Sequence, residues 1–223
     1  MAGASSLSLA AKAWSHDSIG DIKRDVFEMA LSAAQCAMRS GDIKDLQTLT
    51  VIDYSRPSTQ KRLWVFDLRD RALLYEELVA HGSGSGMNMA TSFSNLADTH
   101  QSSLGLFRTD DTYTGRNGYS LRLHGLDAGF NDNARNRLIV MHGADYVNPS
   151  ATASLGRLGR SWGCPAVRPE VARQVIDSLK NGQMIFSYYP NTNWLTHSPF
   201  IKCREKAQAL AGGGITAKDL ASN

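Results

Sequence analysis

Short runs of β-branched and aromatic residues, each bounded by turn residues, constrain the fold of this chain most. They occur at residues 48–54 (T-L-T-V-I-D-Y), 63–68 (L-W-V-F-D-L), 73–82 (L-L-Y-E-E-L-V-A-H-G) and 183–189 (Q-M-I-F-S-Y-Y). Runs of this length and composition are typical of β-strands. The pattern therefore predicts a mainly β chain of the α+β class.

Two further predicted strands each end in His-Gly. Residues 119–125 (Y-S-L-R-L-H-G) alternate, with the leucines on one face and Arg122 and His124 on the other. Residues 137–143 (R-L-I-V-M-H-G) are apolar on both faces, which is typical of a central strand. His142 is therefore expected at the end of a central strand, where the edge of a sheet gives way to a cleft.

Helical patterns occur near both ends of the chain. Apolar residues at helical spacing predict an amphipathic helix at 21–39 and a second helix at 169–181, which has a proline near its start. Between them, residues 82–118 are rich in Gly and Ser and indicate long loops around one or two strands. Arg116, in one of these loops, could line a cleft.

The length of the chain suits one core with appendages. A chain of 223 residues buries roughly 70–75% of the surface that its unfolded form exposes. We divide it into an N-terminal helical segment (1–45) that packs on the core, a main domain (46–201) and a peripheral C-terminal tail (202–223).

Charge and hydropathy argue against two classes of partner. The chain has 24 Lys and Arg against 21 Asp and Glu, a net charge of +3, and the charges are interspersed, so nucleic acid is not an expected partner. No apolar run approaches the roughly 20 residues of a membrane-spanning helix. The first residues lack a charged segment followed by an apolar one, so we expect no export signal within this chain.

Three cysteines leave at least one free thiol. Cys36 and Cys203 could pair in an oxidising compartment, but Cys36 falls on the first predicted helix, where a buried lone thiol is equally plausible. Cys164 stands in R-S-W-G-C-P-A-V, 22 positions after His142. It is the cysteine whose surroundings call for a chemical explanation.

Cys164 and His142 suit nucleophilic catalysis. A cysteine nucleophile needs a base or a cation that raises its thiolate fraction, and His142 is the natural candidate. In a tight turn, the N–H groups of Gly163 and Cys164 could stabilise the oxyanion of an acylated substrate. The spacing alone equally allows a buried structural cysteine and a core histidine.

Other polar residues compete for roles at this site. His124 also ends a strand and could be the base, could bind substrate or could be a polar face residue. The Arg137 guanidinium matches a carboxylate, although a solvated charge at the start of a strand is the more common explanation of such an arginine. A zinc site of Cys164, His142 and His124 lacks the close paired spacing of zinc ligands, so we do not expect a metal.

The order M-H-G, then a loop with A-D-Y-V-N-P-S, then G-R-S-W-G-C resembles the L,D-transpeptidase (YkuD-type) catalytic domain, whose signature is His-Gly, a loop and Ser-His-Gly-Cys. The resemblance extends from about Leu63 to Tyr189 and is greatest to a divergent branch of the family. It implies a curved β-sandwich or barrel of mixed sheet, with short peripheral helices and long active-site loops. It also implies peptidoglycan stem peptides as donor and acceptor, no cofactor, and a periplasmic or cell-envelope location.

The same resemblance implies residue roles. Cys164 is expected to be the nucleophile, His142 the general base, and Gly143 the residue whose carbonyl orients the imidazole. The oxyanion donors are expected to be the N–H groups of Gly163 and Cys164. The substrate is expected to contact Ser161, Trp162, Arg137, His124 and Arg168.

Two departures from the signature and several alternative functions remain at this point. Trp162 replaces the second His, and Pro165-Ala166-Val167 replaces a sequence in which Arg or Asn follows closely, a group for which Arg168 could substitute. Water as acceptor would make the site an L,D-carboxypeptidase or endopeptidase, and Trp162 beside the thiol favours a catalytically silent wall-binding module. Papain-like peptidases place Cys before His, and the His of sortases lies much further upstream.

Overall fold

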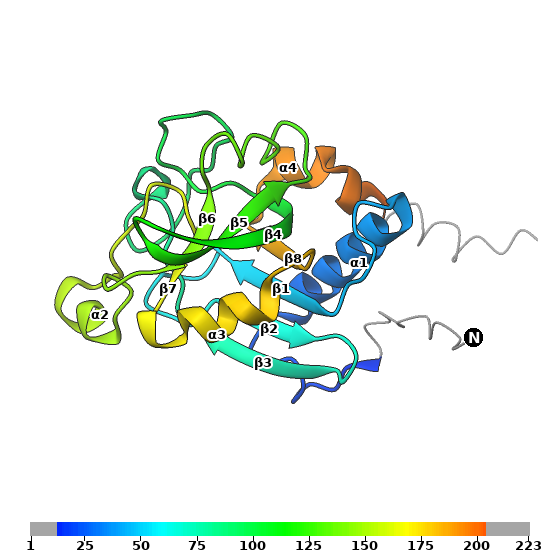
Figure 1. Cartoon of the computed structure of the whole chain (residues 1–223), viewed down its shortest axis with the longest axis horizontal. Helices are drawn as coiled ribbons and strands as arrows, with labels where there is room; N and C mark the ends of the chain where they lie inside the picture. Colours follow the sequence, from blue (N-terminus) through cyan, green and yellow to red (C-terminus); the bar gives the residue numbers. More distant parts are fainter. Residues whose placement is uncertain (1–12, 204–223) are drawn as a thin grey trace, which may run out of the picture.

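The computed structural model describes residues 13–203, and its central feature is one curved, mixed β-sheet (Figure 1). Its eight strands lie in the order β3-β2-β1-β8-β4-β5-β6-β7. They are β1 (Thr48–Asp53), β2 (Leu63–Asp67), β3 (Ala72–Glu77), β4 (Gly105–Gly115), β5 (Gly118–Gly125), β6 (Val140–Gly143), β7 (Ala166–Val167) and β8 (Met184–Tyr188). The expected mainly β fold is confirmed.

The sheet nearly closes into a barrel. The β1–β8 and β6–β7 pairs are parallel, and the other pairs are antiparallel. Just after β3, the N–H of Ala80 donates to the carbonyl of Ala166 in β7 at 2.8 Å, so the two ends of the strand order meet. This closure brings the segment after β3 against the loop that carries Cys164.

The labelled helices that accompany the sheet are α1 (Arg24–Ser40), α2 (Pro149–Leu155), α3 (Pro169–Leu179) and α4 (Thr192–His197), and residues 199–203 are also helical. The two predicted helices correspond to α1, which ends at Gly41 in a left-handed conformation, and α3, which starts with Pro169. Among residues 13–203, no helix has both the length and the apolar content that a bilayer span requires.

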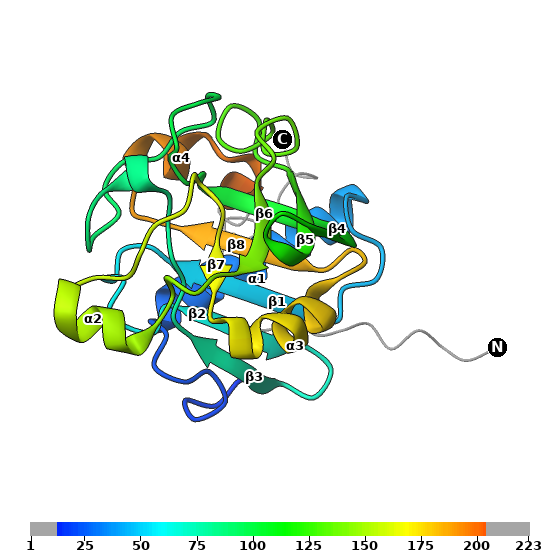
Figure 2. The same ribbon diagram turned by 60° about the vertical axis from the view of Figure 1, so that its left-hand side comes forward.

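The helices α2 and α4 lie in segments for which the sequence analysis predicted no helix. Asn148 caps α2 by accepting from the Ser150 N–H at 2.8 Å, and Asn191 caps α4 by accepting from the Trp194 N–H at 2.9 Å. α2 projects from the body of the molecule in both views (Figures 1 and 2), and α4 buries Trp194 completely. The two caps show why these short segments become helical.

One hydrophobic cluster joins α1, α3 and the sheet. α1 packs against β1 and β8, and α3 packs against β1, β5 and β6. The buried face of α1 consists of Val26, Phe27, Ala30, Leu31, Ala33, Ala34, Cys36 and Ala37. The division of the chain at residues 45 and 201 stays a prediction, and the expected C-terminal tail lies outside the described residues from 204 onward.

Cys36 and Cys203 form a disulfide, which the sequence analysis left open. The bond joins α1 to the helical residues 199–203, across 167 positions of sequence. Cys164 is a free cysteine. The structure thus separates a structural pair from the one thiol that is available for chemistry.

Candidate active site

The site forms where β6 and β7 run side by side. His142 in β6 pairs with Ser120 of β5 on one side and with Ala166 of β7 on the other. Cys164 lies two residues before Ala166, so the parallel pairing brings it beside the start of β6. There the Val140 N–H donates to the Cys164 sulfur at 3.4 Å.

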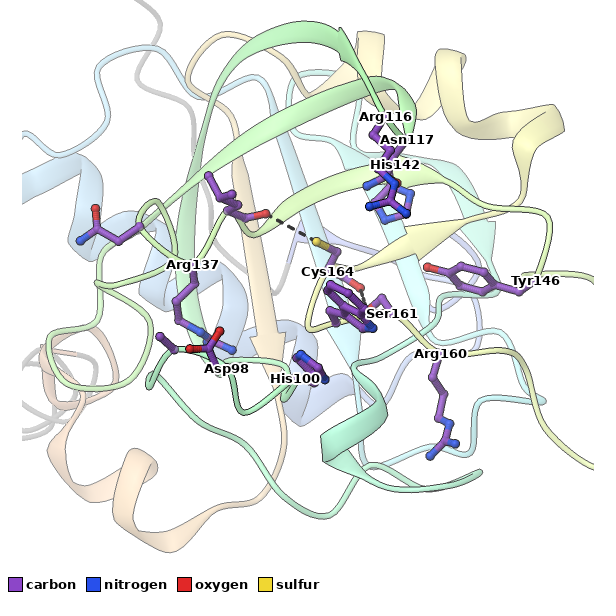
Figure 3. Close-up of a pocket in the computed structure, with 14 residues that line it drawn as sticks. Asp98, His100, Arg116, Asn117, Arg137, His142, Tyr146, Arg160, Ser161 and Cys164 are labelled. Atoms are coloured by element: carbon purple, nitrogen blue, oxygen red, sulfur yellow. Dashed lines mark hydrogen bonds between the residues drawn. The ribbon is translucent and has the colours of Figure 1, made fainter.

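A cavity of about 610 Å³ opens at this point and contains both His142 and Cys164 (Figure 3). In this view Arg137 and Asp98 lie on one side of Cys164, and Tyr146 lies on the other. A volume of this size suits a ligand the size of a small peptide segment. The lining residues are Ala97, Asp98, His100, Arg116, Asn117, Asn136, Arg137, Leu138, His142, Tyr146, Arg160, Ser161, Trp162 and Cys164.

His142 is a buried, neutral imidazole with a defined tautomer. Its Nδ1 lies 2.8 Å from the Gly143 carbonyl oxygen, which can only accept, so Nδ1 carries the proton. The other nitrogen, Nε2, is then an acceptor. Burial lowers the pKa of His142, and the Gly143 carbonyl opposes that shift. His142 therefore has the protonation state of a general base, with the Gly143 contact that the resemblance implies.

Cys164 is half-buried and is present as a thiol. Burial raises its pKa, and the Val140 N–H and the positive charge of Arg137 oppose that shift. The sulfur lies 3.7 Å from the carbonyl oxygen of Leu138, to which it donates (Figure 3). The sulfur thus points at Leu138 rather than at His142, and catalytic hydrogen bonds of this kind often tighten only when substrate is bound.

The turn around Gly163 is held by the Ser161 hydroxyl. Gly163 has φ 118°, which favours glycine, and its N–H donates to Ser161 Oγ at 3.1 Å. The same hydroxyl donates to the carbonyl of Cys164 at 2.6 Å. Of the two expected oxyanion donors, the Gly163 N–H is therefore engaged, whereas the Cys164 N–H faces its own sulfur and lowers the thiol pKa.

Trp162 forms an aromatic wall of the cavity. Its indole is 70% exposed and stacks on the His100 imidazole, with ring centroids 4.8 Å apart and an interplanar angle of 5°. Both rings line the cavity, and so does Ser161. Trp162 and Ser161 therefore lie where a substrate contact is expected. An exposed indole beside the Cys164 thiol is an apolar surface that a ligand can cover.

Arg137 does not lie on the strand of His142, contrary to the sequence prediction. β6 begins at Val140, and the intervening Leu138 has a left-handed φ of 56° and is 77% exposed. The Arg137 guanidinium donates to the carbonyls of Ser94 and Gln101, both at 2.7 Å. It therefore ties a loop to the wall of the cavity instead of standing free in solvent.

The lining of the cavity is predominantly cationic. Arg116, Arg137 and Arg160 line it, and Asp98 is the sole carboxylate among the lining residues. Arg116 lies in the two-residue turn of the β4–β5 hairpin, and Arg160 donates to the carbonyl of Gly86 at 2.9 Å. Because the guanidiniums of Arg137 and Arg160 contact carbonyls rather than carboxylates, the cavity favours an anionic ligand.

Two of the expected substrate contacts lie away from the cavity. His124 pairs with Arg108 of β4 and is not among the lining residues. Arg168 makes a two-pronged ion pair with Glu77, at 2.7 and 3.0 Å. The zinc alternative is not assembled either, because no group of three or more His, Cys, Asp or Glu side chains in residues 13–203 could hold a metal ion.

The sequence analysis did not single out several lining residues. Tyr146 follows His142 by four positions in the quoted A-D-Y-V-N-P-S loop, and this proximity was a usable signal. Burial raises the pKa of Tyr146 to about 12, so it lines the cavity as a neutral phenol. His100 and Asp98 gave no comparable signal, since only the folded loop brings them to Trp162 and Arg137.

One comparison with known proteins shows the family of this chain. A family model of the L,D-transpeptidase catalytic domain matches residues 19–188. No curated protein matches the chain. Solved structures that match include an L,D-transpeptidase from Mycobacterium smegmatis (15% identity, TM-score 0.39, 64% of this chain and 59% of that chain). The helical cell shape determining protein Pgp2 from Campylobacter jejuni also matches (10% identity, TM-score 0.44, 82% of this chain and 63% of that chain). Each of these two matches spans less than two thirds of the solved chain.

Proposed function

Since the chain belongs to the L,D-transpeptidase catalytic domain family, we propose that it is a cysteine-dependent L,D-transpeptidase that cross-links peptidoglycan stem peptides. One observation carries the proposal: the free thiol of Cys164 and the neutral imidazole of His142 line the same cavity. The order His then Cys, from a strand end and a following loop, provides a base and a nucleophile without any cofactor.

In the acylation step, Cys164 attacks the carbonyl of an L-configured residue that precedes a D-configured one. His142 Nε2 takes the thiol proton, a bond forms between sulfur and the carbonyl carbon, and the oxyanion develops beside the Cys164 N–H. The bond from that carbon to the nitrogen of the D-residue then breaks. The nitrogen leaves as an amine after His142 returns the proton to it, and a thioester remains on Cys164.

In the transfer step, an amine of a second stem peptide attacks the thioester. A carbon–nitrogen bond forms, the carbon–sulfur bond breaks, and the proton lost by the amine passes through His142 to the sulfur. Water at the same position would give a hydrolase with the same catalytic pair. Transfer and hydrolysis therefore differ in the acceptor that reaches the thioester.

The charges around the cavity suit the proposed donor. A stem peptide of L-Ala, D-Glu, a meso-diamino acid and D-Ala carries several carboxylates, and Arg116, Arg137 and Arg160 line the cavity. We favour the carbonyl of the third residue as the donor over that of the first. The Cys36–Cys203 disulfide supports an oxidising location, such as the periplasm or cell envelope.

The test is incubation of the enzyme with purified disaccharide tetrapeptide, followed by mass spectrometry of the products. We expect a dimer with release of D-Ala from the wild type, and no dimer from Cys164→Ala at an unchanged melting temperature. Loss of a D-Glu-containing fragment identifies the first junction as the donor. Cleavage without any dimer assigns the chain to the hydrolases, and dimer formation by Cys164→Ala removes the nucleophile from this proposal.

A further inference from the structure

Ser102 lies three positions before β4 and outside the residues that line the cavity. Its side chain contacts the loop that carries Cys164 (residues 160–165), which we call the nucleophile loop. Ser102 is buried, with 1% of its surface exposed. Its hydroxyl accepts from the Gly82 N–H at 3.0 Å and donates to the carbonyl oxygen of Gly163 at 3.2 Å. The hydroxyl of Ser102 thus donates its proton to the carbonyl of Gly163, the residue before Cys164.

That carbonyl belongs to the same peptide unit as the N–H of Cys164. Peptide bonds are planar, and none of those in residues 13–203 is cis, so the Gly163 oxygen and the Cys164 N–H point in opposite directions. A group that holds the oxygen therefore sets the direction of the N–H. On its side of the peptide, this N–H faces the Cys164 sulfur.

We propose that Ser102 is a positioning residue, which aims the N–H of Cys164 at the oxyanion that forms during acylation. The inference rests on the proposed function, because it concerns the acylation of the same thiol. Ser102 touches neither the sulfur nor the cavity, so it acts through the Gly163–Cys164 peptide. The sequence gives no sign of this role, since 61 positions separate Ser102 from Gly163.

The peptide needs such a restraint because Gly163 is intrinsically permissive. At φ 118° it has no Cβ that would limit its backbone, and Ser161 contacts the Gly163 N–H and the Cys164 carbonyl but not the Gly163 carbonyl. A hydrogen bond to the carbonyl also polarises the amide, which strengthens the N–H on its far side as a donor. Preorganised donors of this kind are effective because they need no rearrangement as charge develops.

Ser102 is itself held firmly on both sides. Its N–H donates to the buried hydroxyl of Ser85 at 2.9 Å. Gly82 approaches so closely that a Cβ there would lie 2.8 Å from the Gly163 Cα and 2.2 Å from the His100 carbonyl oxygen. The segment after β3 therefore packs backbone to backbone against the nucleophile loop and presents a fixed hydroxyl to it.

Two small electrophiles separate this role from a general structural one. In p-nitrophenyl acetate, the Cys164 sulfur bonds to the acetyl carbon and the thiol proton passes to His142. An oxyanion forms, and p-nitrophenolate leaves as the carbon–oxygen bond breaks. In iodoacetamide, sulfur displaces iodide from a methylene carbon and no oxyanion forms. The thiol proton again passes to His142. The Cys164 N–H therefore stabilises an oxyanion only in the ester reaction, and it affects alkylation only through the thiol pKa.

For Ser102→Ala we expect ester acylation to slow by about tenfold or more, while alkylation by iodoacetamide, which feels the N–H only through the thiol pKa, slows far less. Ser102→Cys, which has a weaker donor of similar size, should give a smaller loss and serves if the alanine variant fails to fold. The matched control is Ser187→Ala. Its buried hydroxyl donates to the Ser103 carbonyl at 2.8 Å, away from the nucleophile loop, and both rates should stay at the wild-type value.

Two results for Ser102→Ala would overturn the inference. An equal loss of both rates would indicate a disordered loop, and two unchanged rates would show that Ser102 has no role in acylation. The Cys164→Ala variant reports the background for each probe. The ester tests the thiol and its amide alone, so an enzyme that makes no peptidoglycan dimer can still confirm the role of Ser102. Failure of the inference and failure of the proposed function are therefore distinct results.

Discussion

At the scale of single residues, Cys164 and His142 form a neutral pair rather than an ion pair. Burial raises the pKa of the Cys164 thiol and lowers the pKa of the His142 imidazole. Both shifts disfavour thiolate and imidazolium in the free enzyme. From sequence, His142 was expected to raise the thiolate fraction in the free enzyme; under the proposed function, these pKa shifts favour transfer of the proton to His142 as the sulfur attacks.

The neutral pair predicts a specific pH dependence. Because the folded-state pKa of His142 lies below the ordinary 6.5, the imidazole stays unprotonated at pH values where an exposed histidine is charged. The acidic limb of kcat/KM for ester acylation should therefore lie below pH 6.5, and alkylation of Cys164 at about pH 6 should be slower than that of free cysteine. Rates of both reactions between pH 4.5 and 10 measure this.

The control for this prediction is a histidine of the neighbouring strand. His142→Ala should remove the acidic limb together with most ester acylation, while His124→Ala should keep the wild-type profile, since His124 does not line the cavity. A limb above pH 6.5, or alkylation faster than that of free cysteine at about pH 6, would instead establish a thiolate–imidazolium pair.

The candidate nucleophile and base could be identified from the sequence, but the residues that contact and position their loop could not. Cys164 and His142 occupy short contiguous motifs whose residue types imply a reaction. Ser102 and His100 contribute through contacts between loops that are far apart in the chain. A serine among many in a Ser-rich region has no local pattern that sets it apart.

At the scale of elements, a buried charged residue supports the segment that follows β3. The Arg62 guanidinium is fully buried and donates to the Val79 carbonyl and to His81 Nδ1, both at 2.8 Å. It lies over the Tyr54 ring, with 5.1 Å between the guanidinium carbon and the ring centroid. The His81 carbonyl in turn accepts from the Ser161 N–H at 3.0 Å. The order of the nucleophile loop therefore depends on this buried group.

This arrangement predicts a loss of stability in acid. Burial and the neighbouring charges of Arg62 and Arg160 lower the pKa of His81 to about 4, from an ordinary 6.5. The unfolded chain therefore binds a proton that the folded chain excludes, and stability is lost as the pH falls from 6.5 towards 4. The full effect is about 3 kcal/mol. Urea unfolding from pH 7 to 4 measures it.

His81→Gln should flatten this part of the pH dependence, because glutamine does not titrate. The variant will be less stable at pH 7, so the quantity to compare is the change in unfolding free energy with pH, not its value at one pH. His124→Gln, on the half-buried face of β5, is the matched control. An unaltered slope in His81→Gln would show that other groups cause the acid sensitivity.

Element prediction succeeded where the pattern was long and failed where it was short. The β-branched runs of β1 and β2 and the amphipathic stripes of α1 and α3 are visible in sequence. The helix α2 has only seven residues, and its signal is an Asn-Pro start with Gly156 in a left-handed conformation at its end. Such a signal also fits a turn, so only the fold distinguishes the two.

At the scale of the whole molecule, the chain is closed by contacts between segments far apart in sequence. β8 is the last strand of the sequence, yet it lies between β1 and β4 in the middle of the sheet and pairs with β1 in parallel. Ala80 and Ala166 join the two ends of the strand order. Strand order of this kind is not encoded in any local pattern, which is why sequence predicted the strands without their neighbours.

The Cys36–Cys203 disulfide is a further link between segments far apart in sequence, and it gives the last prediction. It spans 167 positions, so it removes much of the conformational freedom of the unfolded chain, and a bond of this kind stabilises by about 2–5 kcal/mol. The double variant Cys36→Ala, Cys203→Ala should therefore melt about 5–15 °C below the wild type. Cys36 is buried, so its replacement by alanine also changes packing. The wild type in dithiothreitol, which keeps both cysteines, is therefore the control for the double variant, and it should also melt well below the oxidised wild type.

Thiol titration in denaturant should find one free thiol per oxidised chain, that of Cys164, and three after reduction. Three free thiols without reductant would show that the pair does not form and would remove the support that it lends to an oxidising location. The double variant and the reduced wild type should both keep Cys164-dependent ester acylation below their melting temperatures. The disulfide joins α1 to residues 199–203, and none of these residues lines the cavity.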